Sequence, residues 1–191
     1  DRVTGKPVWP IVEKPVPQSD VPGEKTSPTQ PFPTKPPAFD RQGTTVDDLL
    51  DFTPALHEEA IRIASAYKMG PLFTPPIVAD TNGKKALFML PNHLGGVNWP
   101  GGAADPETGM FYVASTTAAD FLALSKPDPK YSDMPYISGS GSGPKRGRPL
   151  AAGSEPPPVI YGGRGGLDTG PQGLPLVKPP WGRITAIEGR A

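Results

Sequence analysis

Short apolar runs alternate along the chain with segments that are rich in proline and glycine. The runs at residues 86–90, 111–114 and 184–187 each have the length of a single β-strand. Proline and glycine interrupt regular secondary structure, so the segments between the runs are expected to be turns and loops. This alternation predicts an all-β protein with long Pro/Gly-rich loops.

Residues 45–70 follow a helical pattern instead. Thr53 and Pro54 provide an N-cap and a proline at the first helical position, and Gly70 stands where a helix would end. The apolar side chains recur at helical spacing and fall on one face, which comprises Leu56, Ala60, Ile63, Ala64 and Tyr67. We therefore expect one inserted amphipathic helix that docks on the rest of the protein.

Two further segments are expected to lack regular structure. Residues 10–37 contain nine prolines, which remove backbone donors and favour a polyproline II-like connection on the surface. A disordered linker, or a ligand for a proline-binding domain, is the alternative for this segment. Residues 120–173 show little periodicity and include glycine-rich tracts, which predicts a long irregular insertion.

The length and the net charge limit the classes of protein to which this chain can belong. The 191 residues suffice for one domain, and the 19 basic and 19 acidic residues leave no net charge. The basic cluster of Lys145, Arg146 and Arg148 lies beside a Gly/Ser tract and is expected to be a solvated loop, so no nucleic-acid partner is predicted. No cysteine is present, which excludes disulfides. The chain opens without a methionine, inside a motif, as an excerpt of a longer protein would.

A cluster of acidic residues precedes the expected helix. Asp47, Asp48 and Asp51 could indicate cation binding, but the spacing and the central glycine of an EF-hand are absent. Thr45 and Asp48 have the spacing that caps a short helical turn. No metal site is expected in this chain.

One turn sequence occurs twice. Asp1 and Asp105 each stand three residues before a Thr-Gly pair. The aspartate can accept hydrogen bonds from backbone amides in an Asx-turn, while glycine supplies the positive φ that follows. A strand is expected after each turn, with Trp9 on the first of them. Repeated strand-turn-strand units of this kind favour a radially repeated fold.

The first copy, Asp1-x-x-Thr4-Gly5-x-x-x-Trp9, resembles the tryptophan-docking repeat of quinoprotein dehydrogenases. The second copy has Val113 in place of the tryptophan, and a third begins at Ala186-Ile187-Glu188 with glutamate in place of aspartate. Segments 10–17, 27–33, 70–76 and 95–101 also resemble, in the same order, the membrane-associated branch that oxidises glucose and polyols. Residues 1–191 thus look like an internal fragment of a pyrroloquinoline-quinone (PQQ)-dependent dehydrogenase.

This resemblance implies an incomplete β-propeller domain, part of an eight-bladed fold that binds PQQ near its axis with a calcium ion. An aspartate base and the quinone would oxidise a sugar, polyol or related alcohol, with electrons passing to a quinone or cytochrome acceptor. The parent protein would be periplasmic and associated with the inner membrane. No catalytic or metal-binding residue is expected within this chain, and alone it should be inactive.

The cofactor-binding candidates lie on the glycine-rich loop at residues 95–102 and just before it. Asn98 matches a cofactor-contacting asparagine of the alcohol-oxidising relatives, and its amide can donate to a carbonyl or carboxylate. Trp99 is a cofactor contact or a residue that packs between blades. His93 faces cofactor or substrate, or is a surface histidine.

Two functions from other classes compete with the dehydrogenase. A non-catalytic β-propeller scaffold of the outer-membrane assembly type would share the repeats without a cofactor pocket. A proline-rich interaction segment would instead dock its polyproline II stretches into aromatic grooves.

Overall fold

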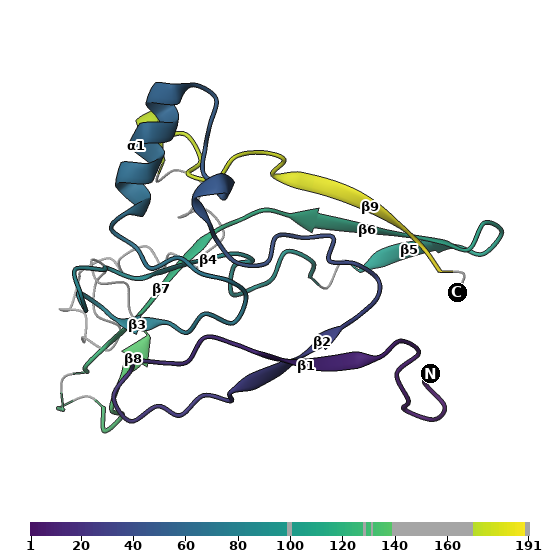
Figure 1. Ribbon diagram of the computed structural model, residues 1–191, viewed down its shortest axis with the longest axis horizontal. Helices are drawn as coiled ribbons and strands as arrows, with labels where there is room; N and C mark the ends of the chain where they lie inside the picture. The colour runs from purple at the N-terminus through teal and green to yellow at the C-terminus, as the bar shows by residue number, and fades with distance from the viewer. Residues whose placement is uncertain (99–100, 128, 131, 139–169, 190–191) are drawn as a thin grey trace, which may run out of the picture.

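The computed structural model describes residues 1–98, 101–127, 129–130, 132–138 and 170–189. Strands predominate in these ranges and one α-helix interrupts them, so the coarse fold prediction is confirmed (Figure 1). The basic cluster at residues 145–148 lies outside the described residues. No helix in the described part of the chain combines the length and the apolar content that a membrane span requires.

The elements follow one another along the chain as short strands with two 3-10 turns and a helix between them. In order they are β1 (Ile11–Pro15), β2 (Thr29–Pro33), η1 (Val46–Asp48), α1 (Pro54–Ala64), β3 (Ile77–Val78), β4 (Leu87–Met89), β5 (Gly102–Asp105), β6 (Met110–Thr116), β7 (Asp120–Ser125), β8 (Ile137–Ser138), η2 (Pro171–Gly173) and β9 (Gly182–Glu188).

The described strands form three sheets. β1 and β2 make an antiparallel hairpin, and β5, β6 and β9 make an antiparallel sheet with β6 in the middle. In the third sheet β7 lies between β3, which runs parallel to it, and β4, which runs antiparallel, and β8 also pairs with β7. Along the long axis of Figure 1, α1 stands near one end and the β5–β6 turn at the other.

The helix starts as predicted and ends early. The Thr53 side chain accepts a hydrogen bond from the Leu56 N–H (3.2 Å), and Pro54 occupies the first turn. The last helical residue is Ala64, so the expected end at Gly70 is wrong. A short non-helical segment joins α1 to the strands. The predicted apolar face is confirmed, because Leu56, Ala60, Ile63, Ala64 and Tyr67 all contribute to the hydrophobic core.

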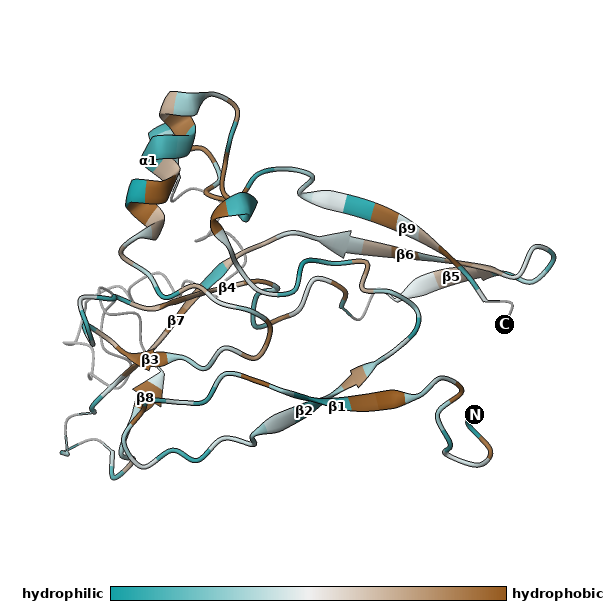
Figure 2. Cartoon of the chain, viewed as in Figure 1, coloured by the Kyte–Doolittle hydropathy of each residue, from teal (hydrophilic) through white to brown (hydrophobic). Residues whose placement is uncertain are grey.

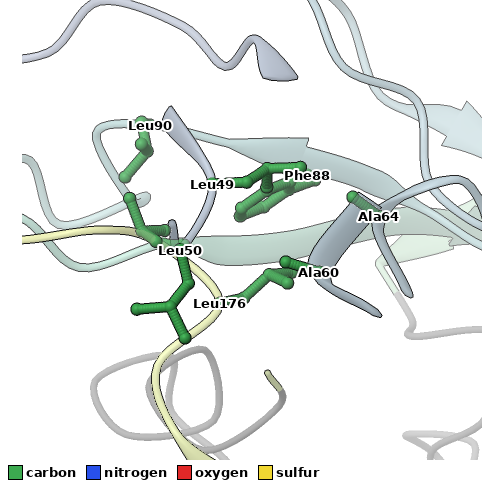
Figure 3. Packing of buried hydrophobic residues seen from close by; sticks show 9 residues of the cluster. Leu49, Leu50, Ala60, Ala64, Phe88, Leu90 and Leu176 are labelled. Carbon is green, nitrogen blue, oxygen red and sulfur yellow. The ribbon is translucent and has the colours of Figure 1, made fainter. Parts of the chain in front are cut away.

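The core lies between α1, the β4–β7 pair and two buried loop segments (Figure 3). Phe88 is fully buried and stacks on Phe121 of β7, with ring centroids 5.1 Å apart. Tyr67 packs against the same Phe121 ring at 4.4 Å. The Leu50 N–H donates to the Leu176 carbonyl (2.9 Å), so the segment before the helix is tied to the segment before β9.

The proline-rich segment is a hairpin, not an unpaired polyproline II-like connection. Hydrogen bonds from the Val16 N–H to the Pro28 carbonyl (3.1 Å) and from the Thr34 N–H to the Pro10 carbonyl (3.1 Å) close the ladder at its two ends. In the register between them, the prolines at 15, 31 and 33 fall in the alternate pairs whose N–H groups point away from the partner strand. The ladder therefore needs no N–H donor from these prolines. Both strands of a two-stranded sheet are edge strands, where proline is tolerated.

The prediction of irregular structure from residue 120 onward is wrong at its start. Asp120–Ser125 forms β7, the central strand of its sheet, and Ile137–Ser138 forms β8. A strand covered on both faces reads as a continuous apolar run without alternation, and β7 has no exposed position, which explains the missing periodicity of Phe121 to Leu124. Residues 139–169 of the expected insertion lie outside the described residues.

The two Asp-x-x-Thr-Gly turns have the same geometry, as predicted. Asp1 Oδ1 accepts from the Val3 N–H (2.7 Å), and Asp105 Oδ1 accepts from the Glu107 N–H (2.9 Å). The closing glycine has a positive φ in both turns, 70° at position 5 and 73° at position 109. Trp9, however, lies in a bend two residues before β1, so its placement on a strand is wrong.

Candidate functional site

The candidate site is the described part of the loop that joins β4 to β5, residues 90–98 and 101, which we call the glycine loop. Near its start lies Asn92, a buried residue whose Oδ1 accepts from the Leu94 N–H (2.8 Å). The Asn92 carbonyl accepts from the Gly95 N–H (2.8 Å), and Gly95 takes a φ of 82°. A side-chain turn followed by a positive φ thus directs the chain away from the core.

His93 lies at the start of the glycine loop with its side chain partly exposed. Its Nδ1 forms a hydrogen bond with Asp120 Oδ2, at the first residue of β7. The Asp120 carboxylate also accepts from the Phe121 N–H (2.8 Å) through its other oxygen. One ring nitrogen of His93 is therefore committed to a carboxylate within the protein, which leaves Nε2 for any other contact. The predicted cofactor contact of His93 remains a prediction.

Asn98 is exposed at the far end of the same loop. Its backbone carbonyl accepts from the Gly101 N–H (3.0 Å), and Gly101 has a φ of 68°, so the chain turns sharply here before β5. The structure thus brings Asn98 and His93 onto one loop, as predicted. Trp99 lies outside the described residues, and its two interpretations stay open.

The middle of the glycine loop is held by residues that the sequence did not indicate. The Gly96 carbonyl accepts from the Thr116 N–H (2.9 Å) of β6. The Asp40 carboxylate lies so close to Gly96 that a Cβ at this position would collide with Asp40 Oδ2. Asp40 in turn forms an ion pair with Arg183 of β9. The two paired residues are 143 positions apart in the chain, so no local pattern could have revealed them.

The acidic residues before the helix serve structural roles. Asp48 Oδ2 accepts from the Thr45 N–H (2.8 Å), as the capping prediction required, and Oδ1 pairs with Arg41 (3.5 Å). Asp51 pairs with Lys178 (3.0 Å). Within the described ranges no three His, Cys, Asp or Glu side chains gather into a metal-binding group.

A cavity of about 550 Å³ is lined by described residues outside the glycine loop. It is bounded by Trp9, by residues 35–39 and by residues 185–188 of β9. The tryptophan of the first Asp-x-x-Thr-Gly motif therefore faces the same space as the segment where the third motif begins. The two motifs thus line one space, and the docking contact that the tryptophan motif implies remains a prediction.

The donor groups of the glycine loop suit a flat, anionic ligand. Asn98 carries its amide at an exposed position, and Gly95 carries no side chain that would keep a ring at a distance. PQQ, a planar quinone with carboxylate groups, has acceptors for these donors. The loop thus fits the cofactor that the sequence implied, whereas the described residues provide no cluster of calcium ligands.

Comparison with known proteins adds an independent observation. Residues 1–191 match the PQQ family described as glucose/ethanol/alcohol dehydrogenase, beta-propeller domain. Quinate/shikimate dehydrogenase (quinone) of Acinetobacter baylyi is 29% identical over 98% of this chain, and the match covers 22% of that protein. Quinoprotein glucose dehydrogenase of Escherichia coli K12 is 30% identical over 98% of this chain and 22% of its own length.

The glycerol dehydrogenase large subunit of Gluconobacter thailandicus is similar to the same extent, at 29% identity over 98% of this chain and 25% of its own length. The chain thus spans a quarter or less of the length of these relatives. No solved structure matches it.

Proposed function

The chain belongs to the PQQ β-propeller family of glucose, ethanol and alcohol dehydrogenases, and from this membership we propose that it is part of a quinoprotein dehydrogenase. The single observation that carries the proposal is the match of this family over all 191 residues. The substrate we propose is a sugar, a polyol or a related alcohol. The relatives named above are dehydrogenases of quinate or shikimate, of glycerol and of glucose, compounds that all bear several hydroxyl groups.

Within this function the described residues would orient the cofactor. When bound, PQQ supplies the acceptor for the two electrons that leave the alcohol, and the protein supplies position and electrostatics. The exposed amide of Asn98 would donate to a carbonyl or carboxylate oxygen of the quinone, and the side-chain-free backbone at Gly95 would let the ring approach. His93, held through Nδ1 by Asp120, would present Nε2 at the edge of the same site.

The wider setting is also a proposal. The two Asp-x-x-Thr-Gly turns and the antiparallel β5–β6–β9 sheet support one blade of a propeller, which we propose to be eight-bladed. We propose calcium as a second cofactor, bound by residues elsewhere in the full-length protein. A periplasmic location at the inner membrane and a quinone or cytochrome acceptor follow from the resemblance to the membrane-associated branch.

The competing functions have less support. A proline-rich interaction segment needs an accessible polyproline II stretch, but β1 and β2 pair with each other along the proline-rich sequence. A non-catalytic scaffold would share the propeller fold without binding PQQ. Cofactor binding therefore discriminates between the enzyme and the scaffold.

The experiment uses the full-length protein that contains this chain. We expect the protein, supplied with PQQ and calcium, to reduce an artificial dye with at least one of glucose, glycerol and quinate. Asn98→Ala is expected to lower activity at limiting PQQ by about tenfold or more, because it removes an orienting hydrogen bond. Gln30→Ala in β2, the matched loss of an amide, should leave activity unchanged. A wild-type protein that retains no PQQ would contradict the proposed function.

A further inference from the structure

The glycine loop is attached to the rest of the protein through a polar cluster that lies outside the hydrophobic core. The cluster consists of Asp40, Arg183 and Thr117 around Gly96. None of these residues belongs to the core built by Leu49, Leu50, Phe88 and Leu176 and their neighbours. The contacts of the cluster instead converge on Gly96, which precedes Asn98 by two residues.

Asp40 links three parts of this cluster through one carboxylate. Oδ1 accepts hydrogen bonds from Arg183 Nη2 and from the Arg41 N–H (2.8 Å). Oδ2 occupies the space beside Gly96 where any other residue would place its Cβ. The carboxylate therefore packs against Gly96 and excludes any larger residue there, while the Thr116 N–H of β6 donates to the Gly96 carbonyl (2.9 Å).

Arg183 completes the attachment from β9. Its Nη2 also donates to Thr117 Oγ1 (3.1 Å), so one guanidinium ties Asp40 to the segment that follows β6. The two side chains of the ion pair are largely shielded, with 23% of Arg183 and 16% of Asp40 exposed. The buried Nε of Arg183 has no hydrogen-bond partner among the described residues. A buried donor without a partner raises the free energy of the folded state. It occurs here on a guanidinium that lies between two acceptors.

We propose that Asp40 and Arg183 are positioning residues that hold the glycine loop so that the Asn98 amide has a fixed orientation toward the quinone cofactor. This inference rests on the proposed function. Both hydrogen bonds come from Nη2 at the tip of the planar guanidinium, and a lysine ammonium on its differently shaped stem would keep the charge without reproducing this geometry. The pair acts through the loop backbone and touches no reacting atom.

The test measures PQQ binding to the full-length apoprotein by fluorescence titration. Asp40→Asn and Arg183→Lys are each expected to weaken PQQ affinity by about tenfold, the order of loss seen when residues that support a binding site are changed. Asp51→Asn is the matched control, because it disrupts the exposed Asp51–Lys178 pair, which does not contact the glycine loop. Its PQQ affinity should equal that of the wild type.

A double-mutant comparison separates positioning from a general loss of stability. If Asp40 acts through Asn98, Asp40→Asn should have little further effect on PQQ affinity in a protein that already carries Asn98→Ala. An equal loss in both backgrounds would overturn the inference, as would a lower melting temperature with unchanged PQQ affinity. Should Asp40→Asn fail to fold, Arg183→Lys carries the same comparison.

The two proposals fail in different ways. In one outcome, the wild-type protein and Asp51→Asn bind PQQ, and Asp40→Asn and Arg183→Lys bind it with unaltered affinity. This outcome would overturn the positioning role and leave the proposed dehydrogenase function intact. Wild-type protein that binds no PQQ would overturn both.

Discussion

At the scale of single residues, local chemistry accounts for much of what the sequence predicts. The Thr53 cap, the Thr45–Asp48 capping box and the Asp1 and Asp105 turns all form as expected, because each depends on neighbours within four positions. Asp40 and Arg183 could not be found in this way, since their contact joins distant parts of the chain. Asn98 was identified through family resemblance and His93 through its place on the same loop, and their cofactor contacts remain predictions.

The Asp105 turn makes the stability of the β5–β6 hairpin depend on pH. The Thr108 hydroxyl and the Glu107 N–H donate to the Asp105 carboxylate and hold its pKa below the ordinary value of about 3.9. The lowered pKa stabilises the folded hairpin at a pH above about 3.9, and this contribution is lost as the pH falls through the folded-state pKa.

Asp105→Asn should remove this pH dependence. We expect the melting temperature of the full-length variant to lie slightly below that of the wild type at pH 6, and the difference to shrink as the pH falls toward 3. Thermal unfolding followed by circular dichroism measures the difference. Glu58→Gln, which changes an exposed carboxylate on α1, is the control. A difference that grows on acidification would contradict the sign of the effect.

At the scale of elements, the sequence predicts those whose pattern reflects one-sided burial. The apolar face of α1 was found because a helix on a surface buries one stripe of side chains. β7 was missed because both of its faces are at least partly covered, so no exposed polar face marks its period. The β1–β2 hairpin was missed because prolines are normally excluded from strands. Only the register shows that these prolines stand at positions where the ladder uses no backbone N–H donor.

The β4–β7 pair is expected to stabilise the protein mainly through Phe88. This ring is fully buried, stacks on Phe121 and lies in the core that joins α1 to the sheet. Phe88→Ala should lower the free energy of unfolding by about 3–5 kcal/mol, since it leaves a cavity. Urea unfolding of the full-length protein measures this, with Phe52→Ala at a half-exposed ring as the control. Equal losses in the two variants would show that Phe88 has no special place in the core.

At the scale of the whole molecule, the described surface retains apolar side chains that a folded protein normally covers. Ile184 of β9 is 77% exposed, and Ile11 and Val12 of β1 are 52% and 44% exposed. Figure 2 shows apolar colour on part of each of these strands, next to hydrophilic positions. Such surfaces mark contacts with other structure. They agree with a chain that spans a quarter or less of its relatives' length.

The sequence reveals the repeated motif and the family, but it does not reveal how the repeated segments lie relative to one another in space. Only the structure places Trp9 at the same cavity as the start of the third motif. The first and last parts of the chain thus line one space in the folded protein.

The most direct test of this account is a crystal structure of the full-length protein with PQQ bound. The account predicts that the Asn98 side chain donates a hydrogen bond of about 3 Å to an oxygen of the quinone, while the Asp40 carboxylate stays against Gly96. PQQ bound elsewhere, with no residue of the glycine loop in contact with it, would contradict the central claim.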